Sequence, residues 1–174
     1  MKEFIVVIFT ENQVGVLNRI TACYLRRKIN IESLRVSESS IKGISMFVIS
    51  AFMHEEIVIK LTAQIGKIVE VIDVAYYLPE ELITQEIALY KVAIKKLAGN
   101  DNRVSLLLQQ WNARLIEIAP SFVVVEKTGT HDEINSMREE LDHQGVLLDF
   151  TRSGSVVLHR DHIEGALREK IESL

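Results

Sequence analysis

The chain has 174 residues, of which 48% are hydrophobic and 25% are charged, and its formal net charge is -4. This composition predicts a folded core rather than disorder, in one ordinary domain or two small ones. Nucleic-acid binding normally requires a basic surplus or stripe, which the sequence lacks. No apolar run approaches the roughly 20 residues that span a bilayer.

The sequence gives no sign of export. Cys23 is the only cysteine, so no internal disulfide framework can form. Residues 1–4 lead straight into a strand-like run and lack the apolar core and cleavage site of a signal peptide. We therefore expect a cytoplasmic protein with no nucleic-acid partner and no membrane partner.

Residues 1–78 carry strand and helix patterns in the order β-α-β-β-α-β. Strands are indicated by β-branched, aromatic or alternating runs, and helices by apolar residues at steps of three and four. Gly66 lies near the end of the second helix pattern, where a C-cap glycine is common. The predicted strands cover residues 5–9, 30–37, 44–53 and 69–78, a turn covers residues 39–43, and the helices are carried by Leu17, Ile20 and Tyr24 and by Ile57, Leu61, Ile65 and Ile68.

The same order starts again after a break at Pro79. A second helix of this half is ended by Gly145, and a short terminal helix is predicted over residues 163–171. The predicted strands cover residues 87–94, 115–118 and 122–126, residues 146–150 and 156–159 are extended, and the helices are carried by Val104, Leu107, Leu108 and Trp111 and by Ile134, Met137 and Leu141.

Glycines support the repeat. Gly15 and Gly99 each follow a first strand, and Gly66 and Gly145 each close a second helix. We therefore predict the α+β class, with two ferredoxin-like βαββαβ domains. The predicted organisation is a first domain of residues 1–78, a linker of residues 79–83 and a C-terminal domain of residues 84–174.

Such a domain leaves surface to cover. Right-handed crossovers place both helices on one face of a four-stranded antiparallel sheet, so the other face and the edge strands stay open. A domain this small gains stability when another chain covers them. We therefore expect at least a dimer.

Catalytic patterns are weak throughout the chain. There is no P-loop, no Gly-rich dinucleotide-binding fingerprint and no nucleophile elbow. Cys23 fits a partly buried helix residue better than a nucleophile, because no histidine is near it in sequence. His159 and His162 could begin a metal site or belong to a solvated surface. Residues 152–154 could hold an anion or only bend a strand.

One segment is a binding candidate: residues 11–17, which join the first strand to the first helix. Free backbone N–H groups at a helix start can hold a carboxylate, aided by the helix dipole. Gly15 allows a ligand to approach the backbone, and Asn12 offers both a donor and an acceptor. Val14, Val16 and Leu17 could supply apolar walls for an aliphatic amino acid. An N-capping asparagine followed by a turn glycine explains the same residues without any ligand.

The same segment carries a family resemblance. Asn12-x-x-Gly15-x-Leu17-x-Arg19 resembles the signature turn of an ACT domain, and Asn30-Ile31-Glu32-Ser33-Leu34 resembles the acetolactate synthase small subunit in particular. Further matches follow in order over nearly the whole chain at residues 67–71, 86–87, 91–92, 119–121, 128–130 and 152–154.

The resemblance implies an ACT domain followed by a second ferredoxin-like domain, in a homodimer that binds a catalytic large subunit. This chain would be non-catalytic and carry no cofactor, while thiamine diphosphate, Mg and FAD would sit on the large subunit. In the family the small subunit activates the large one and confers feedback inhibition, usually by valine, in branched-chain amino-acid biosynthesis. The resemblance places the effector between two protomers, held by Asn12, Gly15, Val16 and Leu17 of one and by Asn30 and Ile31 of the other.

Three departures and two alternative functions accompany this resemblance. The loop of residues 38–43 differs in length and composition from the family form. The family often has glycine where this chain has Lys28, and threonine where it has Arg35. A free-standing ACT sensor of another enzyme or a transcription factor is one alternative. An acylphosphatase-like hydrolase using Arg19 and Asn12 is the other, although its Gly-rich phosphate loop is missing.

Overall fold

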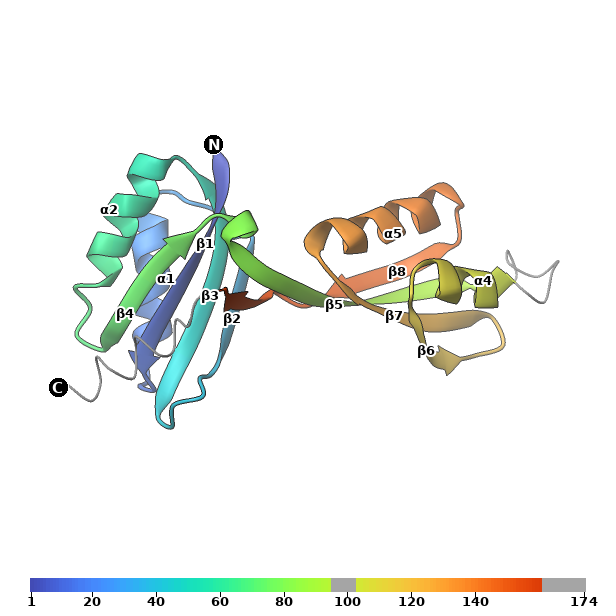
Figure 1. Cartoon of the computed structure of the whole chain (residues 1–174), viewed down its shortest axis with the longest axis horizontal. Helices are drawn as coiled ribbons and strands as arrows, with labels where there is room; N and C mark the ends of the chain where they lie inside the picture. The colour runs from blue at the N-terminus through green and yellow to red at the C-terminus, as the bar shows by residue number, and fades with distance from the viewer. Residues whose placement is uncertain (95–102, 161–174) are drawn as a thin grey trace. The chain divides into compact units, whose positions relative to one another are not determined.

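The computed structural model describes residues 1–94 and 103–160. Contacts divide the chain into two compact units (Figure 1). Unit 1 comprises Met1–Ile83 together with the segment that starts at Val157, and unit 2 comprises Thr84–Val156. No helix among the described residues is long and apolar enough to cross a membrane.

Unit 1 is a four-stranded antiparallel sheet in the order β2-β3-β1-β4, with two helices against one face (Figure 1). This is the ferredoxin-like arrangement, because the two outer strands are joined to the inner pair by helical crossovers. Its elements are β1 (Lys2–Glu11), α1 (Val16–Arg26), β2 (Ser33–Glu38), β3 (Ile44–Met53), α2 (Glu55–Ile65) and β4 (Val71–Tyr77).

Strand β1 is buried on both faces, which explains its continuous apolar sequence. One side packs against α1 and α2 in a cluster that includes Val6, Ile20 and Leu61. The other side packs with Leu82 and Val157 in a second cluster. The buried members of this cluster are Ile5, Val7, Phe9, Val48, Leu82 and Val157. Leu82 and Val157 therefore cover part of the sheet face that the helices leave open.

Unit 2 repeats the same topology, with the strand order β6-β7-β5-β8 and one core cluster beneath its helices. The turn η1 (Pro79–Glu81) leads into β5, and β9 also pairs with β5. Its elements are β5 (Leu82–Ala93), α4 (Arg103–Gln110), β6 (Arg114–Ile118), β7 (Phe122–Gly129), α5 (His131–His143) and β8 (Leu147–Arg152). The short strand β9 (Val156–His159) follows them, and its residues from Val157 onward belong to unit 1. The predicted α+β class with two ferredoxin-like domains is confirmed.

Several element boundaries differ from the prediction. β2 begins at Ser33 rather than at residue 30, because the chain leaves α1 through a tight turn at Lys28 before it can pair with β3. β5 begins at Leu82, within the residues expected to be a linker. The C-terminal domain was predicted to cover residues 84–174, but unit 2 ends at Val156. Val157 belongs to unit 1, because its side chain is buried against the sheet of that unit. Gly99 and the predicted helix over residues 163–171 lie outside the described residues.

Candidate functional site

The candidate turn joins the end of β1 to the start of α1, and two neighbouring loops hold it in place. The N–H of Asn12 donates to the carbonyl of Gly43, in the β2–β3 loop, at 3.0 Å. The N–H of Glu11 donates to the carbonyl of Glu70, which precedes β4, at 2.9 Å. Because both bonds are made by backbone, the position of the turn is largely independent of its side chains.

Gly15 is the N-cap residue of α1 and adopts a left-handed conformation, with φ of 89°. A side chain there would be strained by the backbone angle, although an added Cβ would meet no atom of this chain within 4 Å. Within the described part of the chain no side chain caps α1, and its first turn has no acidic residue. The positive end of the helix dipole thus opens onto free space, where backbone N–H groups can donate hydrogen bonds to a carboxylate.

The structure assigns different contributions to the four predicted residues of this turn. Asn12 and Gly15 are exposed, and Leu17 is 40% exposed. Val16 is only 1% exposed and packs in the core beneath the helices. Its side chain therefore cannot form the apolar wall expected from the sequence, and it has only its backbone N–H to offer a ligand.

Asn30 and Ile31 lie at the opposite end of the sheet from this turn. They precede Ser33, which pairs with Ser50, and Ser50 in turn pairs with Ile5 near the start of β1. The turn follows Glu11, so the two groups are separated by about 20 Å of strand. One chain alone does not bring the predicted residues together, and a site that uses all of them requires a second chain.

An ion pair beside the turn was not predicted from the sequence. Arg19 Nη2 lies 2.7 Å from Glu70 Oε1, and the Glu70 side chain is only 12% exposed. The other carboxylate oxygen of Glu70 is buried and has no hydrogen-bond partner in the described residues. The pair ties α1 to the loop whose backbone holds Glu11. Its only sequence signal was that both residues fall in segments that match the family.

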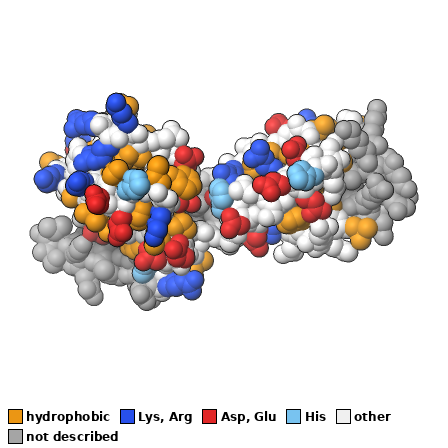
Figure 2. All heavy atoms as spheres, turned by 90° about the horizontal axis from the view of Figure 1, so that it is seen from above, with side chains coloured by type: hydrophobic (Ala, Val, Ile, Leu, Met, Phe, Trp, Pro, Cys, Tyr) orange, Lys and Arg blue, Asp and Glu red, His pale blue; other side chains and the backbone are white. Residues whose placement is uncertain are grey.

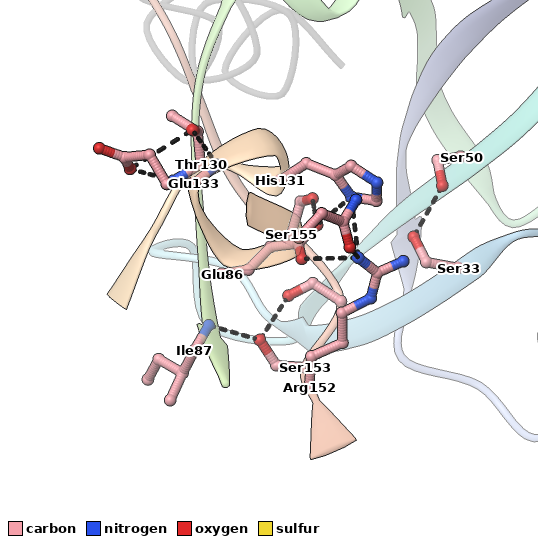
Figure 3. Close-up of polar contacts among 12 residues, drawn as sticks. Ser33, Ser50, Glu86, Ile87, Thr130, His131, Glu133, Arg152, Ser153 and Ser155 are labelled. Atoms are coloured by element: carbon pink, nitrogen blue, oxygen red, sulfur yellow. Dashed lines mark hydrogen bonds and ion pairs between the residues drawn. The ribbon is translucent and has the colours of Figure 1, made fainter. Parts of the chain in front are cut away.

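Unit 2 contains a second polar cluster, centred on Glu86, whose side chain is 6% exposed (Figure 3). Ser155 Oγ donates to Glu86 Oε1 at 2.8 Å, and His131 Nδ1 lies 3.4 Å from the same oxygen. Arg152 Nη1 lies 3.8 Å from Glu86 Oε2 and donates to Asn135 Oδ1 at 3.2 Å. The cluster therefore joins β5, α5 and the end of β8.

Three short segments that matched the family converge on this cluster. Glu86 and Ile87 come from β5, Thr130 caps α5 beside His131, and Ser153 exchanges two hydrogen bonds with the Ile87 backbone at 2.9 and 3.0 Å (Figure 3). A serine, a histidine and a glutamate meet here, but the hydroxyl of Ser155 bonds the carboxylate instead of the imidazole. This arrangement does not generate a nucleophile, and it acts as a structural tie.

Two side chains of unit 2 have shifted pKa values that report the same packing. Burial raises the pKa of Tyr90 to about 12, and its hydroxyl donates to the Ile134 carbonyl at 2.8 Å. The N–H of Thr130 donates to Glu133 at 2.8 Å and lowers the pKa of that carboxyl. The Tyr90 hydroxyl holds α5 against the sheet, and Glu133 caps the start of α5.

The remaining sequence candidates are placed as follows. Cys23 is buried at 4% exposure in α1, as predicted. The His159 ring packs against Tyr77, with centroids 4.9 Å apart, and His162 lies outside the described residues. Trp111 packs against the core of unit 2.

Comparison with known proteins assigns a family to each unit. Residues 6–73 match the family described as the AHAS small subunit-like ACT domain, and residues 85–161 match the family described as the small subunit of acetolactate synthase. The first match contains the Gly15 turn, and the second contains the Glu86 cluster. Together the two matches cover most of the described chain.

Individual proteins agree with these matches over most of their length. The acetolactate synthase small subunit of Mycobacterium leprae is 31% identical over 153 residues, covering 88% of this chain and 89% of that protein. That of Bacillus subtilis is 26% identical and covers 98% of both chains. The crystal structure of the Thermotoga maritima small subunit superposes with a TM-score of 0.81 at 25% identity, over 94% of this chain and all of that one. The chain belongs to the family of acetolactate synthase small subunits.

Proposed function

We propose that this chain is the regulatory subunit of acetolactate synthase, and that it activates a thiamine-diphosphate-dependent catalytic subunit and confers feedback inhibition by valine. The chain supplies no catalytic group or cofactor of its own. Thiamine diphosphate, Mg and FAD belong to the catalytic subunit. The chain's chemical task is to bind a small zwitterion and change the activity of its partner.

The observation that carries this proposal is the uncapped start of α1 at Gly15. Its N–H groups and dipole suit a carboxylate, and the open space beside Gly15 admits one. Leu17 is partly exposed next to it and can contact an aliphatic side chain. A branched-chain amino acid has both of these features.

We further propose that the effector site is shared across a homodimer. β2 is an edge strand that pairs on one side with β3, and a 2.8 Å hydrogen bond between the Ser33 and Ser50 hydroxyls adds to this pairing (Figure 3). Leu34 and Val36 project from it at 37% and 45% exposure. A two-fold axis that pairs this edge with its copy runs the two β2 strands antiparallel. The turn of one protomer then meets Asn30 and Ile31 of the other.

Substitutions at Gly15 test the proposal. Gly15→Asp places a negative charge where the effector carboxylate binds, and we expect valine affinity to fall at least about a hundredfold. Gly15→Ala keeps the site neutral and should cost less than about tenfold, through backbone strain near φ of 89°. Calorimetric titration of valine into each variant measures the difference.

Unfolding of the same variants separates ligand loss from damage to the turn. Because an added Cβ meets nothing within 4 Å in this chain, we expect both variants to lose a similar, small amount of stability, about 1 kcal/mol. Valine binding by Gly15→Asp that equals wild type rules out this site. If Gly15 only shapes the turn, Gly15→Asp and Gly15→Ala should bind valine equally, and both should lose the same small amount of stability.

A free-standing ACT sensor is a less suitable function for this chain. Residues 85–161 match the second module of acetolactate synthase small subunits, which a sensor of another enzyme has no need to carry.

A further inference from the structure

A basic groove runs along the helical face of unit 1. It lies between α1 and the loop that follows α2, and has a volume of about 330 Å³. Ala22, Cys23 and Ile68 form an apolar floor, and Arg19, Arg26 and Lys67 form the rim. Lys and Arg side chains gather along one side of unit 1 in the space-filling view (Figure 2).

The groove walls are fixed by the protein rather than by a ligand. Arg27 Nη1 donates to Gln64 on α2, and Arg27 Nη2 donates to the Lys60 carbonyl at 3.2 Å. These bonds join the end of α1 to α2 across their packed interface. The groove is therefore preformed, which lowers the entropic cost of filling it.

The charge of the groove is not balanced locally. Arg19 is neutralised by Glu70 at 2.7 Å, but Arg26 and Lys67 have no ion-pair partner within residues 1–94 and 103–160. No acidic residue lines the groove, although the chain as a whole carries a net charge of -4. Two uncompensated cations beside an apolar floor select an occupant that combines carboxylates with an apolar side chain.

We propose that the catalytic subunit docks on unit 1 by laying an acidic segment with an apolar anchor into this groove. This inference rests on the proposed function, which makes the catalytic subunit the partner of the chain. The groove is open along its length, whereas small-molecule sites bury most of their ligand. A protein segment can use an open groove because the rest of the partner surface covers it.

The same helix then connects the two sites. α1 begins at the Gly15 turn and supplies Arg19 and Arg26 to the groove rim. Arg19 also pairs with Glu70, whose backbone holds the residue before the turn. An effector that shifts the start of α1 therefore alters the groove that holds the partner.

Charge reversal tests the docking surface. We expect the double variant Arg26→Glu, Lys67→Glu to weaken binding of the catalytic subunit at least about tenfold at about 50 mM salt. The loss should shrink at about 500 mM salt, because screening removes the electrostatic part. Lys2→Glu, a single charge reversal at the exposed start of β1, is the control and should bind as wild type does. Surface plasmon resonance with the immobilised catalytic subunit measures each affinity.

The readouts separate this inference from the proposed function. Valine binding and the melting temperature of the double variant should stay near wild type, which excludes misfolding. If wild type binds and activates the catalytic subunit while the double variant binds it equally well, docking in the groove is wrong and the proposed function stands. If wild type neither binds nor activates, both are wrong. Equal weakening by Lys2→Glu would show a general charge effect and would also overturn the groove.

Discussion

Two residues that flank α1 adopt left-handed backbone conformations, and only one of them is glycine. Gly15 precedes the helix with φ of 89°, and Lys28 follows it with φ of 54°. The N–H of Lys28 bonds the Leu25 carbonyl and the N–H of Ile29 bonds the Tyr24 carbonyl, which is a Schellman ending. Glycine adopts this conformation without strain, so the backbone at this position favours glycine over the lysine that this chain carries.

Replacing Lys28 by glycine should therefore stabilise the protein. A non-glycine residue in the left-handed region costs about 1 kcal/mol, partly offset by the greater freedom of glycine in the unfolded chain. We expect Lys28→Gly to raise the free energy of unfolding by about 0.5 kcal/mol in urea titrations. Lys28→Ala keeps the strain and should give no gain, so equal stabilisation by both variants would locate the effect in the lysine side chain instead.

At the residue scale the sequence predicted which residues form the turn before α1, but not which of their side chains are exposed to a ligand. Leu17 and Val16 are neighbours in the motif, yet one is partly exposed and the other is in the core. The register of a short helix start decides this, and one residue of uncertainty reverses it. The Arg19–Glu70 pair was also missed, because a salt bridge between residues so far apart in sequence leaves no local pattern.

The element that depends most clearly on its cap is α5. Thr130 and Glu133 form a reciprocal capping box, in which the Thr130 hydroxyl accepts from the Glu133 N–H and Glu133 accepts from the Thr130 N–H. We expect Thr130→Ala to lower the free energy of unfolding by about 1 kcal/mol. Denaturant unfolding monitored by circular dichroism measures this.

The charged half of the capping box should be sensitive to acid. Hydrogen bonding to the Thr130 backbone lowers the pKa of Glu133 below its ordinary value of 4.5. A lowered carboxyl pKa contributes stability that is present above 4.5 and is lost as the pH falls through the folded-state pKa. Wild type should thus exceed Glu133→Gln in stability at pH 7, and the difference should vanish in acid. Glu139→Gln, exposed on the same helix, is the control, and a difference that persists unchanged in acid would contradict the capping role.

At the element scale the strand and helix order was predictable throughout the described chain. Period-two and period-three-to-four patterns are local, so β1 to β8 and the helices between them could be read from sequence. The Glu86 cluster could not, since it joins the ends of β5, β8 and α5, which only tertiary packing brings together. Its three segments were visible as separate matches without a shared role.

For the whole molecule the exposed edge strand β2 is the surface that a second copy would cover. An edge strand with exposed Leu34 and Val36 invites pairing with a second copy. We expect Val36→Lys to weaken dimerisation about tenfold or more, because it would bury an unpaired charge at the two-fold axis. Ile59→Lys, which replaces a residue of 48% exposure on α2, should not. Light scattering over a dilution series compares them, and a monomeric wild type would exclude the shared effector site.

The organisation of the whole chain was predicted in outline and differs in its boundaries. A repeat of six elements is visible in the sequence, whereas the return of Val157 to the sheet of unit 1 is not. A four-residue strand carries too little pattern to show which sheet it covers. The consequence is that a fragment of residues 1–78 lacks both Leu82 and Val157, and so leaves part of the β1 surface uncovered.

The central claim is that this chain both activates a catalytic subunit and makes it sensitive to valine through the Gly15 turn. The most direct measurement is acetolactate formation by the catalytic subunit, titrated first with this chain and then with valine. We predict that wild type and Gly15→Asp both raise the rate, and that valine lowers it only with wild type. No rise on adding the chain, or equal valine inhibition with both proteins, would contradict the account.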